Sequence, residues 1–249
     1  MGMKASFIAG LALFVTALSS AHANDMGPDV FVKNEYVKIY MFMGDTLRSS
    51  GALATDCLRE ARDWARTVEA GERSKSDAPP DVVPIFSRRY DIRSIVGNKR
   101  YVSVTWRGSS EIGDVEVSSA DAAFLWDSKS GKRIGLGGFF KEAEDGGPAM
   151  TRLLGELTSG LTAQTGKDQA ASVIASLAPS LNNLGPISLA PSTAPGRSSG
   201  LTFHFALPVS GRPTLQHMEI FVPWTKFERY LSPHGRTIFG GKWRERHIW

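Results

Sequence analysis

Three side chains near the end of the chain have the types and spacing of a metal or acid–base site. His204 lies in the alternating segment 201–207, and His217 and Glu219 lie in a second alternating segment that ends at Val222. Successive side chains of a strand point to opposite faces, so if the apolar residues of both segments share one face, these three share the other. Two imidazoles and a carboxylate are acceptable zinc ligands, or a base with an orienting carboxylate.

A solvated polar face on a half-buried sheet carries the same residue types, and it is the competing interpretation. Three candidate ligands without a fourth are a common accident of strand alternation. We therefore treat His204, His217 and Glu219 as candidate binding residues. We expect no metal, no catalytic residue and no cofactor.

The other candidates for chemistry favour structural roles. Cys57 is the only cysteine, so the chain cannot form an intrachain disulfide. It lies on the apolar stripe of a predicted helix with no histidine nearby in sequence, which favours a small buried hydrophobe over a nucleophile. No Gly-x-Ser-x-Gly elbow occurs, and the glycines at 135–138 lack the rest of a phosphate-binding motif.

The periodicity predicts an α+β fold: an antiparallel β-sheet built from hairpins, with helices packed on one face. Trp64 lies on the stripe of the first helix and Trp126 on the most strongly patterned strand, so we expect both to be largely buried. Ser232-Pro233 is predicted to end the last helix. The predicted strands fall within 30–43, 85–96, 100–106, 122–136, 201–207 and 215–222, the helices at 52–70, 147–163, 167–177 and 223–231, and a polar loop at 108–119.

The first 23 residues have the order of an export signal. Lys4 gives a positive start, an apolar run covers 7–18, and Ala21-His22-Ala23 is a small-x-small cleavage site. We predict cleavage after Ala23, with Ala21 and Ala23 as the small residues that the peptidase requires. The mature chain would begin at Asn24, lack a membrane span and be periplasmic or secreted, as a single domain over 24–249 with halves at about 30–140 and 141–240.

The net charge of the chain limits the classes of binding partner that we expect. The formal net charge of +4 and the isoelectric point near 9.2 are mild and spread along the chain, so they do not indicate a nucleic-acid partner. They are compatible with weak attraction to an anionic wall polymer or membrane surface.

Several motifs follow one another in a recognisable order. They are Trp126-Asp127, Ser130-Gly131-Lys132, the segment 136–140, the strand Gly200-Leu201-Thr202-Phe203-His204-Phe205, and the step Val222-Pro223-Trp224. This order resembles the extracytoplasmic family shared by the N-terminal part of the peptidoglycan deacetylase PdaC and the outer part of the anti-sigma factor RsiV. The resemblance covers about 30–239.

The resemblance implies a non-catalytic binding module of the bacterial envelope. The RsiV-type domain is a receptor for lysozyme, and the deacetylase activity of PdaC belongs to a separate domain that this chain lacks. The implied partner is thus a wall-associated protein such as lysozyme, or a peptidoglycan fragment. The alternative is a metal-assisted hydrolase acting on peptidoglycan through His204, His217 and Glu219. A third possibility is a structural envelope protein without a small ligand.

Overall fold

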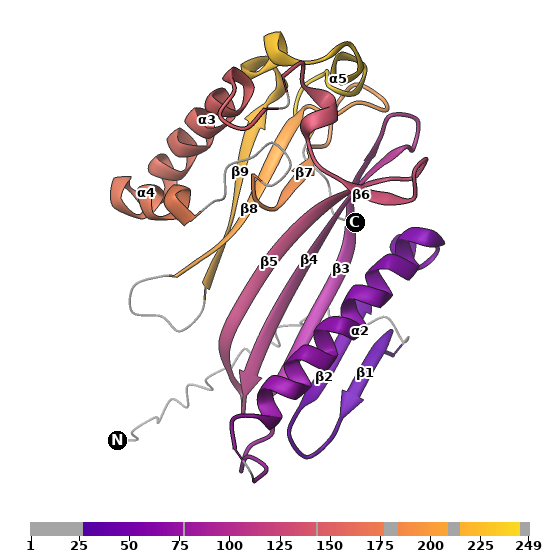
Figure 1. The fold of residues 1–249 in the computed structure, drawn as a ribbon, viewed down its shortest axis with the longest axis vertical. Coiled ribbons are helices and arrows are strands. Elements are labelled where there is room, and N and C mark those ends of the chain that lie inside the picture. The colour runs from indigo at the N-terminus through magenta and orange to yellow at the C-terminus, as the bar shows by residue number, and fades with distance from the viewer. Residues whose placement is uncertain (1–26, 77, 143, 177–183, 209–214, 245–249) are drawn as a thin grey trace, which may run out of the picture.

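The computed structural model describes residues 27–244 except 77, 143, 177–183 and 209–214, so the predicted signal and its cleavage site lie outside the described residues. Two sheets and a set of helices make up the molecule (Figure 1). The large sheet has the order β1-β2-β3-β4-β5-β6 and the small sheet the order β7-β8-β9. The strands are β1 (Val30–Lys33), β2 (Lys38–Met43), β3 (Ile85–Val96), β4 (Tyr101–Ile112), β5 (Val115–Asp127), β6 (Lys132–Ile134), β7 (Ile187–Leu189), β8 (Gly200–Pro208) and β9 (Leu215–Pro223).

The α+β class is confirmed, with one pairing that the hairpin pattern did not predict. β2 and β3 run parallel, because α1 (Asp45–Arg48) and α2 (Ala52–Arg73) carry the chain back between them. All the other pairs are antiparallel. The helix α2 buries Leu53, Cys57 and Ala61 against the large sheet, so its apolar stripe covers one face of that sheet (Figure 1).

The predicted polar loop at 108–119 is wrong. β4 and β5 form one long hairpin that turns at Gly113, whose positive φ of 64° suits glycine. The end of the hairpin near this turn is largely open to water, where even Ile112, Val115 and Val117 are 50%, 57% and 42% exposed, so few apolar residues are needed there. Polar composition therefore concealed a strand whose outer face needs no apolar side chain.

The predicted helices after residue 140 are confirmed, except for the one at 223–231. α3 (Pro148–Thr165) and α4 (Lys167–Ser176) form as expected, whereas 223–231 is two short 3-10 turns, η2 (Trp224–Lys226) and η3 (Glu228–Tyr230). A further turn, η1 (Gly137–Phe139), follows β6. Ser232-Pro233 begins a helix, α5 (Pro233–Ile238): the Ser232 hydroxyl accepts from the Gly235 N–H at 3.0 Å, and Pro233 occupies the first turn.

Two apolar clusters form most of the core. The larger one packs α3 and α5 against the small sheet, and the other lies between α2 and the large sheet. Trp126 is 5% exposed, which confirms its predicted burial. Trp64 is only half-buried, because it lies at the border of α2 and covers the Arg88 guanidinium at 4.1 Å from the ring centre.

Among the described residues, no helix is both long enough and apolar enough to cross a membrane.

Candidate functional site

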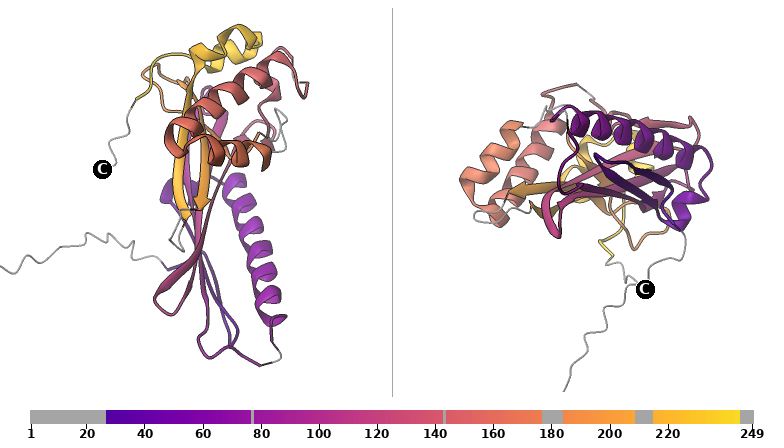
Figure 2. Two further views of the ribbon diagram at one scale, coloured as in Figure 1. Left: turned by 90° about the vertical axis from the view of Figure 1, so that its left-hand side faces the viewer. Right: turned by 90° about the horizontal axis from the view of Figure 1, so that it is seen from below.

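The small sheet packs on the face of the large sheet opposite α2. Ser94 Oγ donates to the Leu189 carbonyl at 2.6 Å, and the Leu189 N–H donates to Ser103 Oγ at 2.9 Å, so β7 is held to β3 and β4. On the same strand as Ser103, Val102 and Val104 point to the opposite face, where α2 lies. Figure 2 shows the two layers on either side of the large sheet.

The predicted trio lies where the two sheets meet. His204 on β8 is directly opposite Glu219 on β9, and its Nδ1 is 3.5 Å from Glu219 Oε1. The other ring nitrogen, Nε2, lies 2.8 Å from Ser188 Oγ on β7. His204 is 6% exposed. The expectation of a solvated face is therefore wrong for this residue, because the large sheet covers it.

His217 takes a different partner from the other two. It sits one step diagonally from His204 in the register, and its Nδ1 contacts the Asp121 carboxylate of β5. Asp121 also accepts from Arg107 Nε of β4 at 3.2 Å. Strand alternation thus brings His204 and Glu219 together. His217 instead contacts Asp121 of the large sheet.

Glu219 completes the link between the sheets. Its Oε2 accepts from Arg93 of β3 at 2.7 Å, while its side chain stays 44% exposed. Contact with His204 lowers the pKa of Glu219 below its ordinary value; burial opposes this, and the positive charges of Arg93 and Arg107 reinforce it. Glu219 therefore remains a carboxylate over the physiological pH range.

These pairs surround a hollow of about 370 Å³, which we call the inter-sheet cleft. Its wall carries both cationic side chains and carboxylates, with Trp106 among them. The Arg93 Nε atom is buried there without a hydrogen-bond partner. The lining residues are Arg89, Asp91, Ile92, Arg93, Thr105, Trp106, Arg107, Asp121, Ala122, His204 and Glu219.

The inter-sheet cleft is suited to binding a polar ligand through hydrogen bonds. Within the described part of the chain, no three His, Cys, Asp or Glu side chains are grouped to hold a metal ion. His204 and His217 each face a carboxylate from a different strand, so the two imidazoles do not converge on one point. What the cleft offers a ligand is a set of paired donors and acceptors, as hydroxyl and amide groups require.

Sequence reasoning missed the half of the cleft that comes from the large sheet. Arg107 and Asp121 are direct neighbours across β4 and β5. That register was hidden because the region from 108 to 119 was predicted as a loop. The available signal was the alternation Val115-Glu116-Val117 shortly after the turn residue Gly113.

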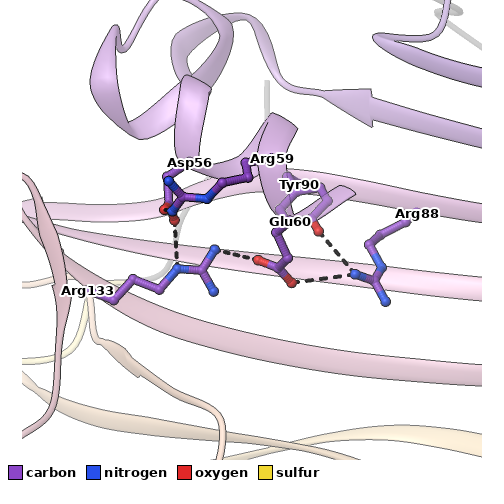
Figure 3. A network of polar contacts seen from close by, with 6 residues as sticks. All are labelled: Asp56, Arg59, Glu60, Arg88, Tyr90 and Arg133. Carbon is purple, nitrogen blue, oxygen red and sulfur yellow. Dashed lines mark hydrogen bonds and ion pairs between the residues drawn. The ribbon is translucent and has the colours of Figure 1, made fainter. Parts of the chain in front are cut away.

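A second polar group, which we call the α2 clamp, fixes the helix to the sheet (Figure 3). Arg133 of β6 donates to Asp56 at 2.7 Å and also contacts Glu60, and Glu60 reaches Arg88 of β3 at 3.5 Å. Arg88 Nη1 also donates to the Tyr90 hydroxyl at 3.1 Å. These residues pair with one another, although the Arg88 Nε atom is buried without a hydrogen-bond partner among the described residues, and we interpret the clamp as a structural element.

Cys57 lies beside the clamp and is fully buried, with an exposure of 0%. Burial raises the pKa of its thiol to about 12, only partly offset by the charge of Arg133. A thiol with such a pKa is not a nucleophile near neutral pH, in agreement with the interpretation of Cys57 as a small buried hydrophobe.

No family model matches the chain, and no curated protein matches it. Several solved structures are similar to it, including two of the DUF3298 family. A member of the DUF3298 family from Bacteroides fragilis is 13% identical, with a TM-score of 0.42, over 74% of this chain and 70% of that one. A DUF3298 family protein from Pseudomonas aeruginosa is 16% identical, with a TM-score of 0.46, over 85% of this chain and 91% of that one. At this similarity neither neighbour bears on function, and the resemblance to the PdaC and RsiV family stays a prediction.

Proposed function

We propose that this chain is an exported, non-catalytic binding module of the bacterial envelope that holds a polar ligand in the inter-sheet cleft. The ligand class is a peptidoglycan fragment or an exposed segment of a wall-associated protein such as lysozyme. The export step depends on the signal at 1–23, and the ligand class on the resemblance to the PdaC and RsiV family.

The observation that carries the proposal is the convergence of paired charges on an open cleft. Arg93 with Glu219, and Arg107 with Asp121, each join two different strands at its wall. Arg107 is 64% exposed, so a ligand can reach its guanidinium without any displacement of the core. Saccharide hydroxyls and peptide amides both donate and accept, and they can bridge such pairs without leaving a buried charge unpaired.

The test is calorimetric titration of the mature chain, beginning at Asn24, with soluble peptidoglycan fragments and, separately, with lysozyme. We expect saturable binding of one of the two. The variant Arg107→Ala should weaken that binding at least tenfold, because its guanidinium is the most exposed donor of the two inter-strand pairs at the cleft wall.

Arg59→Ala is the matched control. Arg59 is 70% exposed and pairs with the buried Asp56, much as Arg107 pairs with Asp121, but it lies on α2 on the other side of the large sheet. Equal loss of affinity in both variants would mean that the ligand senses overall charge. Absence of binding to both probes would refute the proposed ligand class.

The competing function is a hydrolase of peptidoglycan, and one observation favours it. The imidazole of His204 and the carboxylate of Glu219 form a base–carboxylate pair next to the cleft. Incubation of the mature chain with purified cell wall, with and without added zinc, separates the two functions. Soluble products that disappear in His204→Gln would support the hydrolase, and binding without products supports the module.

A further inference from the structure

A hollow of about 490 Å³, which we call the end pocket, lies at the end of the molecule away from β1. It opens between the first turns of α3 and the segment that contains η2, η3 and α5, and Figure 1 shows α3 and α5 together at this end. A second hollow of about 460 Å³ shares Arg152 and Arg229 with it, and neither has a described lining residue in common with the inter-sheet cleft. The lining residues of the end pocket are Arg152, Thr225, Lys226, Glu228, Arg229 and Arg236.

Four of these lining residues are cations, and each comes from a different element. They are Arg152 of α3, Lys226 of η2, Arg229 of η3 and Arg236 of α5. The elements are fixed relative to one another by buried residues of one apolar cluster, namely Leu153 in α3, Phe227 between the two turns and Ile238 in α5. Packing of a shared core therefore brings together cations that are far apart in the sequence.

Carboxylates offset only part of this positive charge. Glu156 accepts from Arg152 Nη2 at 2.6 Å and lies 3.5 Å from Lys226 Nζ, so one carboxylate serves two cations. Arg152 Nε also donates to the Lys226 carbonyl at 3.0 Å, which fixes this guanidinium at the pocket wall. Glu228 is the one carboxylate among the described lining residues. The four cations are thus accompanied by two carboxylates.

Arg229 and Arg236 differ from the arginines of the large sheet. Every described arginine of β3, β4 and β6 has a carboxylate partner. Arg229 instead lies 4.6 Å from the ring centre of its neighbour Tyr230, and within the described part of the chain neither Arg229 nor Arg236 forms an ion pair. A hollow lined mainly by charges of one sign focuses the electric field and attracts the opposite charge. The end pocket therefore has the electrostatics of an anion site.

We propose that the end pocket binds the phosphate group of an organic phosphate. One guanidinium can satisfy a carboxylate through two parallel hydrogen bonds, whereas a phosphate offers several acceptor oxygens in different directions. Cations that converge from four elements suit the second geometry. The two adjoining hollows also leave room for the molecule that carries the phosphate, since small-molecule sites have volumes of roughly 300–1,000 Å³. This site is separate from the inter-sheet cleft, so it does not depend on the proposed function.

Calorimetric titration of the mature chain with glycerol 3-phosphate tests the site. We expect saturable binding to one site, no binding of glycerol, and binding of acetate that is at least tenfold weaker. Arg236→Gln should weaken the binding of glycerol 3-phosphate at least tenfold, because it removes a charge-assisted hydrogen bond. The Arg236 side chain forms no hydrogen bond or ion pair with the described residues, so the melting temperature should stay unchanged. Arg62→Gln is the matched control, at an exposed arginine of α2 that is likewise in no ion pair with the described residues.

Co-sedimentation with lipid vesicles identifies the source of the phosphate. Binding to phosphatidylglycerol vesicles that Arg236→Gln weakens at least tenfold would support the proposal with a lipid headgroup as the ligand. Binding of glycerol 3-phosphate alone would support it with a soluble ester. Absence of binding to both probes would refute the proposal. So would acetate that binds as tightly as glycerol 3-phosphate, or an equal loss of affinity in Arg236→Gln and Arg62→Gln, which would show that only the net charge of the chain matters.

Discussion

Arg100 holds the Asp127 carboxylate through two parallel hydrogen bonds, from Nε to Oδ1 and from Nη2 to Oδ2, each 2.9 Å long. The Lys129 N–H donates to the same carboxylate at 3.0 Å. Asp127 ends β5 and opens the turn to β6, where Gly131 adopts a φ of 65°. The pair therefore joins the start of β4 to the end of β5, at the turn that follows the most strongly patterned strand.

This pair predicts a pH dependence of stability. Arg100 is the main cause that lowers the pKa of Asp127 to about 2 from an ordinary 3.8, with burial opposing it. A folded pKa below the unfolded one stabilises the protein above about pH 4, and this contribution is lost as the pH falls toward 2. The full shift corresponds to about 2 kcal/mol, and water around Arg100, which is 38% exposed, reduces it to about 1–2 kcal/mol.

Urea melts of Asp127→Asn at pH 7 and pH 3 measure this contribution. The variant should lose about 1–2 kcal/mol at pH 7 and less at pH 3. Its difference from the wild type should therefore shrink as the pH falls. A difference that is constant with pH would show that the substitution acts through the turn geometry instead of the charge.

His204 should contribute to stability as a buried residue. His204→Ala removes the partner of Ser188 Oγ, which is itself 0% exposed, and leaves that hydroxyl unsatisfied. The expected loss in the free energy of unfolding is roughly 1–3 kcal/mol. A surface change such as Arg62→Ala on α2 should stay within about 0.5 kcal/mol. A loss of that small size for His204→Ala would contradict the burial of this face.

Arg88 and Trp64 should be energetically coupled. The Arg88 guanidinium lies between two indole rings, 4.1 Å from the centre of Trp64 and 3.8 Å from that of Trp106. A double-mutant cycle of Trp64→Leu with Arg88→Met should give a coupling of about 1 kcal/mol. The total loss for Trp64→Ala should fall below the roughly 3–5 kcal/mol of a fully buried tryptophan. Zero coupling would mean that the stacking contributes nothing.

Cys57 should be unreactive in the folded chain. Its raised pKa and complete burial both keep the thiolate population low near neutral pH. Ellman's reagent at pH 8 should modify it only as the protein unfolds in urea, with the same midpoint as the loss of tryptophan fluorescence. Fast stoichiometric labelling in buffer would show that α2 opens locally.

The parts of the fold that sequence predicts are those with one apolar face. The stripe of α2, the β8–β9 hairpin and the turn at Asp127 each carry a complete local signal. The polar half of the β4–β5 hairpin does not, because its open face needs no apolar residue. The pair Ser232-Pro233 is compatible with either end of a helix. Serine is a common N-cap and proline suits the first turn, but the residue before a proline also tends to end a preceding helix.

The sequence predicted only the part of the inter-sheet cleft that comes from the β8–β9 hairpin. Strand alternation placed His204 and Glu219 on one face and brought them together. It gave no means to predict that Asp121 of another sheet would take His217, because contacts between sheets depend on how the layers pack. His217, which looks solvated on its own hairpin, thus contacts a carboxylate that lies 96 positions away in the chain.

The most direct test of the central claim is backbone amide mapping by NMR during titration of the mature chain with peptidoglycan fragments and with lysozyme. We predict that the bound ligand shifts the amides of Arg93, Thr105, Arg107, Asp121 and Glu219, and that the fragments are recovered unchanged afterwards. Shifts confined to α3 and α5 at the far end of the molecule, or the appearance of cleaved fragments, would contradict a binding module with its ligand in the inter-sheet cleft.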